Sequence, residues 1–306
     1  MRAPRVRGVV AWLRQYRLEC VLVCPLFLYV LGLTVAPIVD TLRLSLTGPL
    51  DGHFPSLVNY RSILGSEVFG AAVVNTVVIA LLSISLQLCM GLAVALTLHA
   101  NFRCRALVRT VMLLPLGVPT IVAGAVMLLI FSRSGYLNAV VFAVADAVQA
   151  LFGARWQFVP LSWTVAGGWR TLATVAVADM WKVLPTVILI FLAGLQAIPD
   201  AVNEAAEVDG ATRWQRFVRI TLPLLRPYIT MAVILRAIDA FRIFELALVL
   251  AGRVEPVLGT YIWSRYGPPT NDPFTAAAAS IVLFGLILVF VVLYLRIAHG
   301  ETEGRA

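Results

Sequence analysis

Charged residues are scarce in this sequence. Only 13% of its 306 residues are Asp, Glu, Lys or Arg, 60% are hydrophobic, and the mean hydropathy is +0.91. Soluble domains carry about 25% charge, so the ordinary soluble classes are excluded. Uncharged stretches long enough to cross a bilayer recur along the chain, and the alternating pattern of an outer-membrane barrel is absent. Because spanning backbone must satisfy its own hydrogen bonds, the sequence predicts an all-α polytopic membrane protein.

Cysteine, histidine and lysine are also few. The three histidines are scattered, and the cysteines fall within or on the predicted cytoplasmic side of spans, so we expect neither a metal site nor a disulfide. No Gly-x-x-x-x-Gly-Lys-Ser/Thr sequence occurs, and the single lysine, Lys182, lies in a predicted span. The chain is therefore not a P-loop ATPase. No nucleophile, metal or acid–base constellation stands out, and we expect no catalytic residue and no cofactor in this chain.

Hydropathy predicts six transmembrane spans. They lie at about 19–42, 71–98, 110–131, 171–194, 228–250 and 274–297, in one domain over 19–298. This domain includes a loop at 195–227, and it is flanked by an N-terminal segment (1–18) and a tail (299–306). The first apolar run is too long for a signal peptide, so we expect it to be retained.

The net charge of +8 comes from arginines that flank the apolar runs, which indicates topology signals rather than nucleic-acid binding. They are most frequent in 2–17, 103–109 and 213–226, so the positive-inside bias predicts that both termini are cytoplasmic. On the opposite side, 137–151 is apolar but short and contains Asp146. We expect an interfacial or re-entrant helix there.

The loop between the fourth and fifth predicted spans is patterned for two short helices. A helix over 201–208 can end at Gly210, because glycine readily adopts the left-handed conformation of a C-terminal cap. Thr212 can then cap a second helix over 213–220, which stops before Pro223. The result is a helix, a sharp turn and a helix on the cytoplasmic face.

This geometry suits a projection that enters a groove on a partner protein. Ala205 and Ala206 allow close approach, and Glu204 can accept a bidentate contact from an arginine. Phe217 and Ile220 provide apolar anchors. The alternative is a solvated amphipathic loop without a partner.

The stretch Glu204-Ala-Ala-Glu-Val-Asp-Gly210, with Ile220-Thr-Leu-Pro223 ten residues further on, resembles the cytoplasmic EAA loop of permease subunits from binding-protein-dependent ABC importers. The flanks 195–199 and 222–227 resemble sugar-importing members similar to the maltose and trehalose permeases. The same members usually have similar residues at four shorter matches, Asn59-Tyr60, Asn75-Thr76, Leu114-Pro115 and Trp181. The resemblance thus covers nearly the whole chain. One departure is 250–256, where the family often has a Thr-Gly-Gly-Pro type of turn.

By this resemblance, the EAA loop docks on the ATPase. The implied coupling residues are Glu204, Ala205, Ala206, Asp209, Gly210, Arg213, Phe217, Ile220, Leu222 and Pro223. The resemblance also implies a non-catalytic subunit in the bacterial inner membrane, with a second permease, two ATPase subunits that bind ATP and Mg, and an extracytoplasmic solute-binding lipoprotein as partners.

The implied cargo is a sugar, a di- or oligosaccharide. An importer of a polyamine, a phosphate ester or an amino acid would use the same type of loop, so these remain alternatives. An ion-driven secondary transporter is a further alternative, because carboxylates lie inside the predicted spans.

Four charges follow one another at i, i+3 spacing in the fifth predicted span, namely Arg236, Asp239, Arg242 and Glu245. Each costs roughly 2.5 to 3.5 kcal/mol at the centre of a lipid-facing helix, so they should face the bundle interior, a water-filled path or the membrane ends. One interpretation is a polar stripe along a translocation path; the other is a ladder of salt bridges. The candidate path residues are Asp239, Arg242, Glu245, Phe241 and Trp181, with Asp179 and Lys182 as a second charged pair.

Overall fold

The computed structural model describes residues 16–100, 102–153, 159–164, 167–252 and 254–303. The predicted N-terminal segment (1–18) lies almost wholly outside these ranges, as do the last three residues of the tail. In the described part of the chain all regular structure is helical, in agreement with the predicted class.

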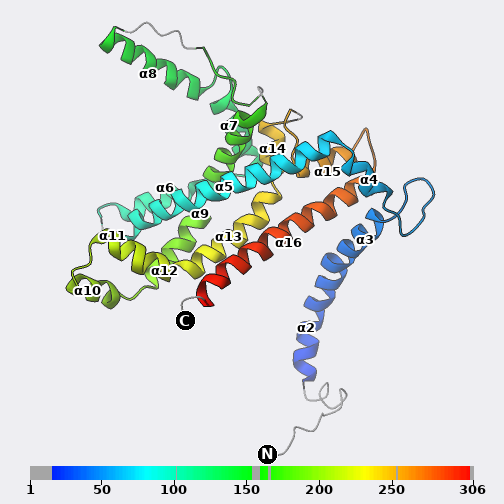
Figure 1. The fold of residues 1–306 in the computed structure, drawn as a ribbon, viewed down its shortest axis with the longest axis horizontal. Helices are drawn as coiled ribbons and strands as arrows, with labels where there is room; N and C mark the ends of the chain where they lie inside the picture. Colours follow the sequence, from blue (N-terminus) through cyan, green and yellow to red (C-terminus); the bar gives the residue numbers. More distant parts are fainter. Residues whose placement is uncertain (1–15, 101, 154–158, 165–166, 253, 304–306) are drawn as a thin grey trace, which may run out of the picture.

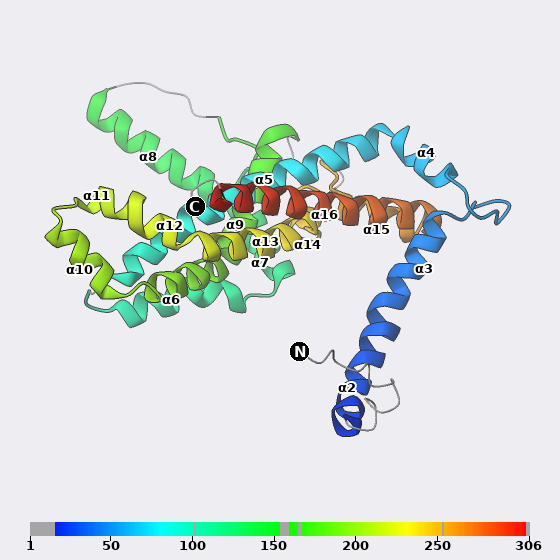
Figure 2. The ribbon, with the colours of Figure 1, turned by 60° about the horizontal axis from the view of Figure 1, so that its bottom comes forward.

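Four long helices form the body of the molecule and run side by side in both views (Figures 1 and 2). They are α5 (Glu67–His99), α9 (Gly168–Gln196), α13 (Arg226–Phe241) and α16 (Pro273–Glu303). The most extensive contact joins α5 to α9, and α13 packs against α5, α9 and α16. The core therefore lies between these four helices.

Shorter helices cover the two ends of this bundle. One end carries α4 (Val58–Leu64) and α15 (Leu258–Tyr266), and the other carries α10 (Asp200–Val208), α11 (Arg213–Arg216) and α12 (Leu222–Leu224), as Figure 1 shows. The segment from α10 to α12, residues 200–224, is called the α10–α12 hairpin below.

Two helices project from the bundle (Figure 1). The first consists of α2 (Arg17–Val30), a π-helical turn (Leu31–Val35) and α3 (Ala36–Ser45), of which α3 packs on α16. The second is α8 (Tyr136–Phe152), which covers the segment 137–151 and contacts α7 (Thr120–Phe131). The interfacial or re-entrant position of this segment stays a prediction. Apolar side chains of α2 and α8 are exposed, as expected for surfaces that face lipid or another subunit.

Within the described residues, five helices are long and apolar enough to cross a membrane, and up to six if one bent pair counts as a span. The five are Arg17–Ser45, Glu67–His99, Thr120–Phe152, Gly168–Gln196 and Pro273–Ala298. The bent pair joins Arg213–Leu224 to Arg226–Phe241 at 61°.

Two of the predicted spans are not continuous helices. The span predicted at 110–131 is interrupted after α6 (Arg105–Gly117), because Pro119 disfavours helical backbone at Val118, which is extended. The span predicted at 228–250 is interrupted between α13 and α14 (Glu245–Leu250), without a proline. Pro185, in contrast, lies within an unbroken α9.

Loops at the end of the bundle that carries α4 and α15 are fastened by polar side chains near the motifs that support the family resemblance. Asn59 donates hydrogen bonds to the carbonyl oxygens of Ser45 and Thr47 at the end of α3, at 2.9 and 2.8 Å. Asn75 donates to Glu255 at 2.9 Å, and the other carboxylate oxygen of Glu255 accepts a hydrogen bond from the backbone N–H of Gly168. The segment 250–256, which departs from the family pattern, thus places the carboxylate of Glu255 at the positive N-terminal end of α9.

Close helix packing depends on small residues. A side-chain carbon on Gly194 would lie 2.6 Å from Cγ of Tyr228 and 2.7 Å from Leu225, so α9 could not approach the start of α13 so closely with any other residue there.

We therefore expect Gly194→Leu to destabilise the protein by about 1–3 kcal/mol, the usual cost of overpacking a core. The unfolding temperature of the detergent-purified protein is the measurement, and Gly70→Leu is the control, since nothing lies within 4 Å of the added carbon at that helical position. Equal unfolding temperatures for the two variants would contradict this account of the packing.

Candidate functional site

A buried arginine connects three of the four central helices. Arg236 of α13 is 1% exposed. Its Nη2 donates to Oδ2 of Asp179 on α9 at 3.1 Å, and its Nε donates to Oε1 of Gln87 on α5 at 2.6 Å. Its Nη1 donates to Oδ2 of Asp239 at 3.0 Å. The guanidinium group therefore neutralises one buried and one exposed carboxylate.

The polar groups around Asp179 complete this network. Gln87 Nε2 donates to Asp179 Oδ2 at 3.0 Å and to Ser83 Oγ at 2.9 Å, while the Ser83 hydroxyl donates to the same carboxylate. No buried side-chain N or O atom among the described residues lacks a hydrogen-bond partner. Such complete satisfaction is what makes a buried ion pair tolerable, because desolvation of each charge costs several kcal/mol.

Ser83 and Gln87 were not singled out from the sequence. Their i, i+4 spacing places both on one face of α5, and a polar pair on one face of an otherwise apolar span was the available signal. Arg236, which could have lain at the cytoplasmic end of its span, instead reaches the middle of α5 and α9.

A cavity of about 430 Å³, the charged cavity, opens beside this network. It lies where the break between α6 and α7 faces the break between α13 and α14. Its ionisable lining residues are Asp179, Lys182, Arg236, Asp239, Arg242 and Glu245, three acidic and three basic, so their formal charges cancel.

The predicted salt-bridge ladder forms at one step, the Arg236–Asp239 pair. Within the described residues, Arg242 and Glu245 belong to no ion pair, and both are exposed at the cavity. The salt-bridge ladder therefore does not extend to Arg242 and Glu245. The helix breaks at 242–244, and an i, i+3 pairing requires a continuous helix.

Lys182 stabilises the opposite wall of the cavity. Its Nζ donates to the backbone oxygens of Pro115 and Leu116, at 3.1 and 3.3 Å. These carbonyls belong to the last turn of α6, where a cation is favourable. The single lysine thus holds the end of α6 at the break.

The predicted path aromatics lie elsewhere. Phe241 is 2% exposed and packs against Phe290 with ring centroids 5.3 Å apart, and Trp181 packs against an apolar cluster. A different aromatic residue, Phe244, lines the charged cavity. A path role for Phe241 and Trp181 stays a prediction.

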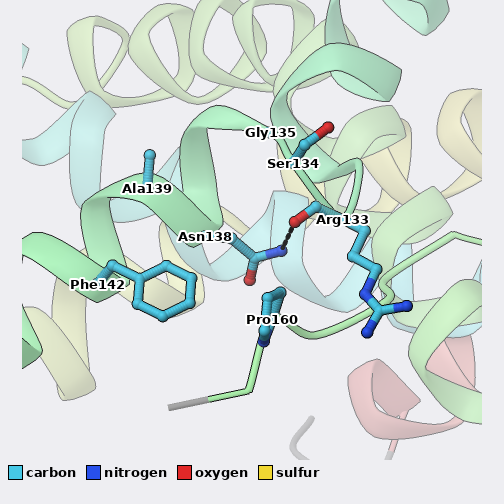
Figure 3. A pocket seen from close by; sticks show the side chains of 7 residues that line it. All are labelled: Arg133, Ser134, Gly135, Asn138, Ala139, Phe142 and Pro160. Atoms are coloured by element: carbon cyan, nitrogen blue, oxygen red, sulfur yellow. Dashed lines mark hydrogen bonds between the residues drawn. The ribbon is translucent and has the colours of Figure 1, made fainter. Parts of the chain in front are cut away.

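A second cavity, of about 480 Å³, lies at the start of α8 (Figure 3). One of its lining residues, Asn138, is buried and donates to the backbone oxygens of Arg133 and Leu161, both at 2.9 Å. Asn138 thereby fastens the segment before α8 to the segment that follows it. This arrangement indicates a structural junction.

The turn of the α10–α12 hairpin is built as the sequence predicts. Gly210 has φ +75°, and the backbone N–H groups of Gly210 and Ala211 donate to the carbonyl oxygens of Glu207 and Ala206, the two bonds of a Schellman motif. Thr212 forms a capping box with Gln215 at the start of α11. The turn is therefore rigid.

The second helix of the hairpin differs from its predicted end before Pro223. It continues through a π-helical segment (Phe217–Thr221) into α12, where Pro223 occupies the first turn. A proline inside a continuing helix supplies no N–H for an intrahelical bond, and here the π-helical segment directly precedes it.

The predicted coupling residues of the hairpin differ in how far their side chains are exposed. Glu204, Ala205, Asp209, Gly210 and Arg213 are exposed, Ala206 is buried, and Phe217, Ile220, Leu222 and Pro223 are half-buried. Glu207 forms an ion pair with Arg216 across the turn, whereas Glu204 forms no ion pair among the described residues. Two large apolar residues of the hairpin that were not singled out from the sequence, Val208 and Trp214, are 88% and 71% exposed.

The bundle, the charged cavity and the end hairpin together define a multi-pass membrane transport subunit. Residues 87–299 match the family described as binding-protein-dependent transport system inner membrane component, and the chain belongs to that family.

Full-length relatives confirm the resemblance to sugar permeases. The chain is 33% identical over 299 residues to the trehalose/maltose transport system permease protein MalF of Thermococcus litoralis, covering 95% of this chain and 96% of the relative. It is 30% identical over 305 residues to the trehalose transport system permease protein SugA of Mycobacterium tuberculosis, covering 95% and 93%. These relatives are transport permeases rather than enzymes.

The same fold occurs in a solved structure, a bacterial alginate ABC transporter in complex with an alginate pentasaccharide-bound periplasmic protein. The TM-score is 0.80 at 21% identity, and the match covers 97% of this chain and 99% of that one.

The buried ion pair between Arg236 and Asp179 allows a prediction about stability. Arg236→Met leaves the Asp179 carboxylate buried without its countercharge, so we expect a loss of about 3–5 kcal/mol in stability. The double variant Arg236→Met with Asp179→Leu should recover most of this loss, since neither charge then remains.

Unfolding temperatures of the purified variants provide the measurement. Arg242→Met serves as the control because this exposed arginine, close by in the chain, forms no ion pair within the described residues. A double variant less stable than Arg236→Met would show that the pair is not the source of the loss.

Proposed function

We propose that this chain is the membrane-spanning permease subunit of an ATP-driven sugar importer, and that the α10–α12 hairpin is its contact with a separate ATPase. The hairpin carries the proposal: a Schellman turn joins α10, which contains the exposed Glu204, to α11, which contains the exposed Trp214. Both helices lie at one end of the bundle (Figure 2). The chain would lie in the inner membrane, with both termini and the hairpin on the cytoplasmic side.

The separation of roles between Glu204 and Glu207 supports this contact. Glu207 is engaged within the hairpin by Arg216, which fixes α10 relative to the following helix. Glu204 remains available for an arginine of the partner, and such charge-assisted, bidentate bonds are strong and directional. Closure of two ATPase subunits on ATP and Mg would then move the hairpin, and with it α9 and α13, which adjoin it in the chain.

The balanced charge of the cavity favours a neutral polar solute. A polyamine would need an excess of carboxylates and a phosphate ester an excess of basic groups, whereas the six ionisable residues of the charged cavity cancel. Their donors and acceptors can instead bind sugar hydroxyls. The names of the relatives, a trehalose/maltose and a trehalose permease, support the same choice.

Three kinds of partner follow from this proposal. A second permease would cover the open side of the charged cavity, two ATPases would supply energy, and an extracytoplasmic binding protein would deliver the sugar. The structural relative was solved with a periplasmic protein that holds an alginate pentasaccharide. This chain itself would act as a conduit without covalent chemistry.

Reconstituted transport tests the proposal. In proteoliposomes that contain the co-purified complex and its binding protein, we expect uptake of trehalose or maltose that requires ATP. Glu204→Arg and Gly210→Pro should abolish uptake at normal expression, the second because proline cannot adopt φ +75°. Glu67→Arg, an exposed glutamate on α5 at the other end of the bundle, should retain it.

Two results would contradict the proposal. Uptake that persists with a disabled ATPase and collapses with an ion gradient would identify a secondary transporter. Unchanged uptake in both hairpin variants would remove the hairpin from the coupling mechanism.

Trp214 gives a separate prediction about affinity. Its exposed indole, which packs against Phe217 with ring centroids 5.7 Å apart, has the character of an interface hot spot. We expect Trp214→Ala to weaken binding of the purified ATPase by about 30-fold or more, equivalent to about 2 kcal/mol. Trp169→Ala, which removes an equally exposed indole from α9, is the matched control and should leave ATPase binding unchanged.

A further inference from the structure

Two exposed aromatic residues lie on α15, at the end of the bundle opposite the α10–α12 hairpin (Figure 1). Trp263 is 57% exposed and Tyr266 is 64% exposed. Trp263 lines two cavities, of about 460 and 480 Å³, and Tyr266 lines the second. We call Trp263, Tyr266 and these two cavities the α15 site.

Polar residues share the lining of both cavities with the indole. Ser264, Arg265 and Thr270 line the first together with Trp263, and Asn271 lines the second. The guanidinium carbon of Arg265 lies 5.1 Å above the ring of Tyr261, which holds this cation at the cavity wall. The α15 site therefore combines an aromatic face with hydrogen-bond donors and acceptors on its rim.

The α15 site connects to the charged cavity through one ring contact. The rings of Trp263 and Phe244 are 5.9 Å apart, and Phe244 lines the charged cavity. A glycine makes this possible: a side-chain carbon on Gly259 would lie 2.7 Å from the backbone oxygen of Ile243. Without a side chain there, α15 packs directly on the helix break, and Trp263, one turn later, meets Phe244.

A lipid-facing anchor does not account for this arrangement. An indole that anchors a helix at the membrane interface has its ring among lipid headgroups. Trp263 instead lines two cavities with polar rims and contacts a residue of the charged cavity. Trp169 provides the contrast, since it is 74% exposed and lines neither of these cavities.

We infer that the α15 site is a receiving subsite for one ring of a neutral sugar, which stacks on Trp263 before the sugar reaches the charged cavity. This inference rests on the proposed function. The C–H face of a pyranose matches the apolar face of an indole, and its hydroxyl groups match the rim formed by Ser264, Arg265 and Asn271. Phe244 is then the next aromatic surface along the path.

Cysteine protection tests the site without requiring ATP or transport. Thr270→Cys, at a position that lines the first cavity together with Trp263 and leaves the indole in place, is made in the complex after Cys20, Cys24, Cys89 and Cys104 are replaced by serine, and a membrane-impermeant thiol reagent is added. Trehalose, maltose and maltotriose are the probes. We expect at least one of them to slow modification at position 270 by threefold or more, and none to slow it at Trp169→Cys. Absence of protection at 270 by all three sugars would overturn the inference.

Uptake kinetics provide the second measurement. We expect Trp263→Leu to raise the half-saturating concentration of sugar-loaded binding protein by about fivefold or more, and Trp263→Phe, which keeps an aromatic face, to stay within twofold of the unsubstituted chain. Equal effects of Trp263→Leu and Trp169→Leu would indicate membrane anchoring and overturn the inference.

The two proposals fail in different ways. If the unsubstituted complex imports no sugar, the proposed function falls and the α15 site falls with it. If that complex imports sugar but Trp263→Leu behaves normally, the α15 site alone is refuted.

Discussion

The ion pair between Arg236 and Asp179 is the constraint on which the rest of the bundle depends. A guanidinium group that is 1% exposed must be neutralised and fully hydrogen-bonded, and its partners come from α5 and α9 as well as from α13 itself. These contacts hold three helices in one register. Because apolar packing between helices in lipid lacks a strong hydrophobic driving force, a polar anchor of this kind fixes the arrangement more specifically than leucines alone.

The same anchor explains why the charged cavity can exist. Two helix breaks, at 118–119 and 242–244, leave carbonyl groups and charged side chains without a regular helical environment. Lys182 binds the carbonyls of the first break, and Arg236 neutralises Asp239 just before the second. Irregular backbone at membrane depth is tolerated where it lines a cavity, and here both breaks face the same one.

The two ends of the bundle are held by hydrogen bonds, and this arrangement favours transmission of movement from the hairpin to the charged cavity. The Schellman turn at Gly210 fixes the α10–α12 hairpin at one end, and Glu255 fastens the loop before α15 to α5 and α9 at the other. Between them, the chain bends by 61° where α12 meets α13, and the helix breaks after α13. A displacement of the hairpin would therefore be transmitted to residues that line the charged cavity, since α13 continues directly from the hairpin.

The sequence by itself determined the helical membrane class, the family, and the turn at Gly210 with its cap at Thr212, because hydropathy, capping chemistry and glycine backbone freedom are local properties. It also indicated the charges of the fifth predicted span. Only the tertiary structure decided their roles: Arg236 turned inward to Asp179, and Arg242 and Glu245 faced the cavity. Phe241 packed on Phe290, whereas Phe244 lined the charged cavity. The tertiary structure also revealed Ser83, Gln87 and the α15 site. The physical reason is that an ion pair or a cavity joins residues far apart in the chain, and which ones meet depends on how the helices pack.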